Sequence, residues 1–111
     1  MVYVGGHTGA GGVKIVFGEI PVTTLPTDVV TVTLGGTPKY LSVIPKQATA
    51  DMYLMSCAFA NPVIGDTAFV ANTASGAGTV YMQITITATG FTAQRITSKG
   101  DTVPFGYLAI M

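Results

Sequence analysis

Few side chains in this sequence could do acid–base chemistry. The carboxylates are Glu19, Asp28, Asp51, Asp66 and Asp101, and His7 is the only histidine. A glycoside hydrolase needs two carboxylates that face one cleft, and a catalytic triad needs a histidine held in a fixed geometry. The aspartates instead lie at or beside the ends of predicted strands, where Asp is a common turn residue, and His7 lies in a glycine-rich segment. We therefore expect no enzymatic activity.

The glycine-rich segment 5–12 superficially matches a phosphate-binding loop. Such a loop needs Gly-Lys followed by Ser or Thr, because the lysine contacts phosphate and the hydroxyl contacts Mg²⁺. Here Gly12 is followed by Val13, so we reject a nucleotide site. One chain does not offer a set of metal ligands either, although copies of His7 around a symmetry axis would be one route to a shared ion. We expect no cofactor and no metal.

The composition predicts a protein that associates. Charged residues make up 9% of the 111 residues, against about 25% in ordinary soluble proteins, while 49% are hydrophobic and the net charge is zero. A neutral surface with so few charges has little electrostatic protection against association. We therefore predict a homo-oligomer rather than a monomer with a threonine-rich surface.

The same composition disfavours several classes of partner. Nucleic-acid binding needs a basic face, but the basic residues are scattered singly along the chain. The apolar runs are too short for a transmembrane helix, and no basic cluster suggests a membrane surface. The single cysteine, Cys57, has no partner for an intramolecular disulfide, and its apolar neighbours favour an inert buried thiol over a reactive one. We expect neither nucleic acid nor membrane as a partner.

Alternating apolar and polar residues predict an all-β fold, a single small antiparallel β-sandwich or jelly roll of about eight short strands. In the clearest run, from Thr79 to Thr89, Met82, Ile84 and Ile86 share one side of the strand. The other predicted strands are 13–20, 29–34, 39–44, 51–59, 66–71, 91–97 and 103–111. The run 51–59 is apolar on both sides, which favours a central strand, with a short helix as the alternative.

Domain organisation follows from the distribution of glycine. Residues 1–12 are predicted to form a flexible glycine-rich N-terminal arm, since glycine-rich segments are poor in fixed conformations. Residues 13–111 are predicted to form the β-sandwich domain.

The C-terminal run Val103–Met111 is apolar on both faces. A terminal strand of this kind must be covered on both sides, either as a central strand of its sheet or by packing one face on neighbouring subunits. On the second interpretation, the residues that we predict to form the oligomer interface are Phe105, Tyr107, Leu108 and Ile110.

Three segments also carry a family resemblance: Leu34-Gly35-Gly36-Thr37-Pro38-Lys39-Tyr40-Leu41, Thr89-Gly90-Phe91-Thr92 and Tyr107-Leu108-Ala109-Ile110. In this order they are similar to an early Gly-Phe-x-Pro-x-Tyr element, a Gly-Phe before a late strand and a closing Tyr-x-Ala-Ile strand. These elements belong to the small β-sandwich domains of tailed-phage virion proteins, best known from tail-fibre tips. Gly36 stands where that family has an aromatic residue. The resemblance covers roughly residues 29–111 and implies a trimeric virion component.

Together these observations predict a structural protein of a bacteriophage virion. We expect a small, trimeric surface subunit, as a capsid decoration or tail-associated protein, that binds other virion proteins. The alternative is a receptor- or glycan-binding tip module of a tail fibre, which exposed aromatic residues in loops would favour; the chain has no tryptophan. A small hydrolase is the third hypothesis, and it lacks the necessary constellation.

Overall fold

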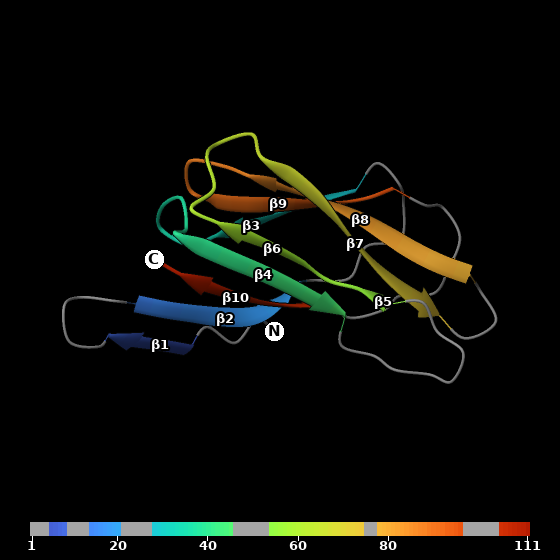
Figure 1. Ribbon diagram of the computed structural model, residues 1–111, viewed down its shortest axis with the longest axis horizontal. Coiled ribbons are helices and arrows are strands. Elements are labelled where there is room, and N and C mark those ends of the chain that lie inside the picture. The colour runs from blue at the N-terminus through green and yellow to red at the C-terminus, as the bar shows by residue number, and fades with distance from the viewer. Residues whose placement is uncertain (1–4, 9–13, 21–27, 46–53, 75–77, 97–104) are drawn as a thin grey trace.

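The protein is an antiparallel β-sandwich (Figure 1). The computed structural model describes residues 5–8, 14–20, 28–45, 54–74, 78–96 and 105–111. In spatial order, the first sheet contains β1 (Gly5–Thr8), β2 (Lys14–Ile20), β10 (Phe105–Ile110), β4 (Tyr40–Pro45) and β6 (Cys57–Ala60). The second contains β3 (Val29–Thr33), β9 (Gly90–Arg95), β8 (Gly78–Ile86), β7 (Thr67–Ala74) and β5 (Leu54–Met55). The predicted all-β sandwich is confirmed.

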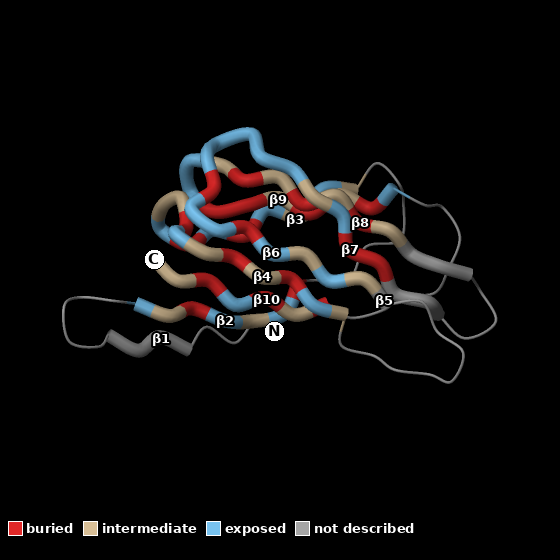
Figure 2. Tube along the Cα trace, in the orientation of Figure 1, coloured by how far each residue is buried: buried red, intermediate tan, exposed pale blue. Residues whose placement is uncertain are grey.

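Along the strands, buried residues alternate with more exposed ones, and the buried residues form the core between the two sheets. In β8, Met82, Ile84 and Ile86 are buried, while the residues between them stay partly exposed, as the sequence pattern predicts. Figure 2 shows the same alternation along β4, β10 and β9. The core cluster consists of Val16, Ile20, Val32, Leu34, Leu41, Val43, Phe59, Val70, Met82, Ile84, Ile86, Phe91, Ala93, Phe105, Tyr107 and Ala109. Apolar burial of this kind is the main favourable term in folding.

The run 51–59 differs from its prediction as one central strand or a helix. Its described part forms two short edge strands in different sheets: β5 pairs with β7, and β6 pairs with β4. The strands are separated by Ser56, which is exposed. The chain therefore crosses between the sheets here, so its apolar residues serve two sheets in turn. Residues 51–53 lie outside the described part.

The N-terminal segment also differs from the predicted flexible arm, at least over Gly5–Thr8. These residues form β1, which pairs with β2 in the register Gly5 with Phe17 and Thr8 with Lys14. The free edge of β2 offers unpaired backbone groups, and glycine does not prevent a strand from using them. The rest of the predicted arm lies outside the described residues.

The connection between β3 and β4 carries the chain from the second sheet to the first. Gly35 adopts a φ of 88°, and the Thr37 hydroxyl donates a hydrogen bond of 2.9 Å to the carbonyl of Thr87. The amide of Leu34 donates to the carbonyl of Thr89, and that of Lys39 to the carbonyl of Ile110, each over 2.7 Å. The three segments that carry the family resemblance therefore meet at one end of the sandwich.

Candidate functional site

Strand β10 is the middle strand of the first sheet, and it divides its side chains between two faces. Phe105 and Tyr107 point into the core with 1% and 4% of their surface exposed. The Tyr107 ring packs edge-on against Phe91, with ring centroids 5.3 Å apart and an interplanar angle of 73°. Leu108 is 36% exposed and Ile110 is half-buried on the opposite side. Of the four predicted interface residues, Leu108 and Ile110 are the two that face away from the core.

We call the side of the first sheet that points away from the core its outer face. The register places Leu108 between Phe17 of β2 and Ser42 of β4, and Gly106 between Glu19 and Ile44. The outward positions with described side chains are Ile15, Phe17, Glu19, Tyr40, Ser42, Ile44, Ala58, Ala60, Gly106, Leu108 and Ile110. Among them Glu19 is the one charged residue, so the outer face is predominantly apolar.

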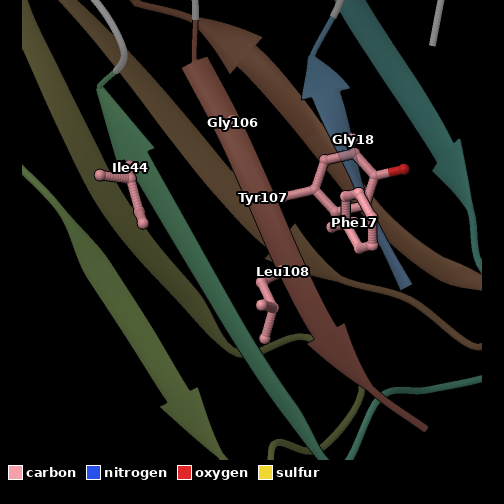
Figure 3. Close-up of a pocket in the computed structure, with 6 residues that line it drawn as sticks. All are labelled: Phe17, Gly18, Ile44, Gly106, Tyr107 and Leu108. Carbon is pink, nitrogen blue, oxygen red and sulfur yellow. The ribbon is translucent and has the colours of Figure 1, made fainter. Parts of the chain in front are cut away.

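A hollow of about 340 Å³ lies on the outer face (Figure 3). Its side chains come from three adjacent strands: Ile44 projects from β4, Leu108 from β10 and Phe17 from β2. The lining residues are Phe17, Gly18, Ile44, Gly106, Tyr107 and Leu108. Gly106 has no side chain to fill the space between Ile44 and Leu108, which explains the hollow. It lacks charged lining residues and therefore suits an apolar group.

Two ionisable groups near these strands have raised pKa values. Burial raises the pKa of the Tyr107 hydroxyl. Burial also raises the pKa of the Cys57 thiol to about 11, and a backbone hydrogen bond with Val43 offsets part of that effect. Cys57 is half-buried, less than the sequence suggests. Both groups are protonated at neutral pH, so neither is an activated nucleophile.

The three carboxylates of the described residues, Glu19, Asp28 and Asp66, lie on different elements. Asp66 accepts a hydrogen bond of 2.9 Å from the Val63 amide, which is the turn role predicted for it. Asp28 immediately precedes β3, and Glu19 lies in β2. Among the described residues, no group of three His, Cys, Asp or Glu side chains can hold a metal ion. Asp51 and Asp101 lie outside the described residues, as does the side chain of His7.

Sequence reasoning missed two features. Arg95 is 2% exposed, although from the sequence it counted only as one of the singly scattered basic residues; its place on the same side of the predicted strand 91–97 as the apolar Phe91 and Ala93 was the available signal. Val63 and Ile64 are 65% and 64% exposed in the connection between β6 and β7, which Figure 2 shows as exposed. No periodic pattern marks those two residues, because they lie in a turn.

Comparisons with protein-family models, with curated proteins and with solved structures find no match to this chain. In the part of the chain that the structure describes, no helix is long and apolar enough to cross a membrane.

Proposed function

We propose that this chain is a non-enzymatic structural protein of a bacteriophage virion. It forms a small trimeric surface subunit, as a capsid decoration or tail-associated protein, and binds other virion proteins. The observation that carries the proposal is the outer face of the first sheet, where Phe17, Ile44 and Leu108 surround an apolar hollow. The phage assignment rests on the order of the three resembling segments.

The size of the exposed side chains supports an association surface. Phe17 is 41% exposed and Ile44 is 50% exposed, and the register makes them neighbours of Leu108 and Gly106. Single exposed apolar residues are ordinary, whereas a contiguous group is typical of an interaction site. Covering apolar surface gains about 25 cal/mol per Å². Glu19 is the one charged residue of this face and lies opposite Gly106, so its desolvation is the main cost that association has to offset.

The chemistry of the hollow favours protein association over glycan binding. Sugar recognition needs an aromatic side chain together with several placed hydrogen-bonding groups. The hollow has Phe17, but Ile44, Leu108 and two glycines form most of the remaining lining. A glycan-binding tip would therefore have to use another part of the chain.

The test is the composition of purified particles. We expect mass spectrometry of virions from the phage that encodes this chain to find it in a stoichiometric amount with the major capsid or tail proteins. A chain that is abundant in the lysate and absent from washed particles would contradict the virion assignment. Specific binding of the isolated protein on a glycan array would instead favour the tip module.

A further inference from the structure

The connection between β6 and β7 ends in a rigid apolar turn. The Asp66 amide donates to the Val63 carbonyl over 3.1 Å, and the Asp66 carboxylate accepts from the Val63 amide over 2.9 Å. Gly65 has a φ of 96°, which suits the third position of a type II turn, and its amide donates to the carbonyl of Ile86 over 2.9 Å. These bonds fix the backbone of the turn, from which the side chains of Val63 and Ile64 extend into solvent.

Val63 and Ile64 are the most exposed large hydrophobic residues of the described chain, at 65% and 64%. An apolar pair held rigidly in water is unfavourable for an isolated molecule. The same rigidity favours binding, because little conformational entropy is lost when the turn enters a partner. The turn therefore has the properties of an anchor that inserts into an apolar pocket.

The outer face supplies a hollow of matching chemistry. Its volume is about 340 Å³, whereas a cavity of roughly 150 Å³ is enough to hold a benzene molecule. The six residues that line the hollow and the two apolar residues of the turn are uncharged, while the carboxylates of Glu19, opposite Gly106, and of Asp66, which accepts from the Val63 amide, lie at the border of the contact. One or two branched aliphatic side chains fit this space.

We propose that the Val63–Ile64 turn of one copy of this chain inserts into the hollow beside Gly106 of the next copy. This inference rests on the oligomer of the proposed function and identifies the contact that builds it. The turn and the hollow belong to different surfaces, so each copy offers the turn to one neighbour and the hollow to another. Such a head-to-tail contact closes into a ring when the rotation between copies allows it, and a trimer is a ring of this kind.

Position and area both favour this arrangement. The turn lies beside the start of β4, where the Asn61 amide donates to the Lys39 carbonyl. Ile44, at the hollow, lies five residues after Lys39 along β4, roughly 17 Å from it.

Strands β2, β10, β4 and β6 present an outer face of only roughly 20 Å by 20 Å. That is about half of the 800 Å² that a partner usually buries in a stable interface. Two copies that met by this face alone would bind weakly, whereas a ring gives each copy two contacts.

Disulfide trapping tests the contact directly, because two cysteines link only when their β-carbons approach within about 4.5 Å. In a Cys57→Ala background, we expect Ile64→Cys alone and Leu108→Cys alone to give no linked species under mild oxidation. An equimolar mixture of the two should give linked dimers. A chain with both substitutions should give covalent oligomers up to the size of the ring.

Two substitutions test the energetics of the same contact. Gly106→Val fills the hollow, and β-branched valine suits a strand position whose φ is not positive, so the folded subunit should remain as stable as before. Ile64→Asp places a charge on the exposed turn. We expect each variant to raise the subunit dissociation constant at least tenfold in sedimentation experiments. The matched control is Phe69→Asp on β7 of the second sheet. This side chain is 47% exposed and lies outside the proposed contact, so its replacement should leave assembly unchanged.

The outcomes separate the contact from the proposed function. If the wild type is an oligomer but the mixture does not cross-link, or Gly106→Val assembles normally, the contact is wrong and the structural role stands. Homodimers linked through Leu108→Cys alone would show face-to-face association and would also overturn the contact. A wild-type protein that stays monomeric at high concentration would overturn both proposals.

Discussion

At the scale of single residues, two strand glycines have opposite roles. At Gly90, which has a φ of 155°, a β-carbon would overlap the Val32 carbonyl oxygen and lie 3.0 Å from the Leu34 amide nitrogen. Glycine is needed there because the backbones of β9 and β3 approach closely. At Gly106 the missing side chain leaves the hollow on the outer face. The first glycine maintains the fold, and the second shapes the candidate site.

The Gly90 role predicts a large effect of a single methyl group. We expect Gly90→Ala to lower the free energy of unfolding by about 2 kcal/mol or more, since either the backbone of β3 or that of β9 must move. Gly36→Ala is the matched control, because the nearest atom to its added carbon is the Met111 methyl at 3.9 Å. Urea denaturation of both variants measures the difference, and equal midpoints would refute the close-approach explanation.

The raised pKa of Cys57 predicts slow chemistry and a pH-dependent stability. With a pKa of about 11 instead of 9.0, the thiolate population at pH 8 is about 100-fold lower than in an ordinary thiol, and alkylation should slow accordingly. The folded state favours the protonated thiol, so its contribution to stability is complete below pH 9 and is lost as the pH rises through 11. Cys57→Ala should remove this part of the alkaline loss. Alkylation at the rate of free cysteine would contradict the buried thiol.

At the scale of elements, the sequence predicts the strands with strong alternation and misses those without it. In β8 and β3 every second residue is apolar, and the structure buries that side of each strand. The run 51–59 has no such period, because its described part serves two sheets in succession. β1 was missed because its glycines read as a flexible segment and give no alternation of apolar and polar residues.

Alternate side chains of β10 point into the core or onto the outer face, so substitutions at neighbouring positions of this strand should have different effects. Tyr107→Ala removes a buried ring, so we expect a loss of about 3–5 kcal/mol in the free energy of unfolding. Leu108→Asp changes a side chain that is 36% exposed, so the subunit should fold and its association should weaken. Circular dichroism on urea titration, together with sedimentation, separates the two effects. An unfolded Leu108→Asp chain would place Leu108 in the core.

At the scale of the whole molecule, the outer face is a product of topology. Its residues come from segments 15–19, 40–44, 58–60 and 106–110, which become neighbours only when β10 enters between β2 and β4. Sequence patterns show that both faces of β10 are apolar, but they do not show which strands flank it. The hollow and its separation from the Val63–Ile64 turn therefore required the pairing register. The small number of charged residues predicted that copies of the chain associate, but it did not indicate which surface they use.

The central claim is that this chain assembles through the predominantly apolar outer face of its first sheet, and its oligomeric mass tests that claim most directly. In a ring, each copy makes two contacts, one through the outer face of its first sheet and one through its Val63–Ile64 turn. We expect light scattering to give three times the mass of one chain, with a melting temperature that rises with protein concentration. A single-chain mass at every concentration, with an unchanging melting temperature, would contradict the claim.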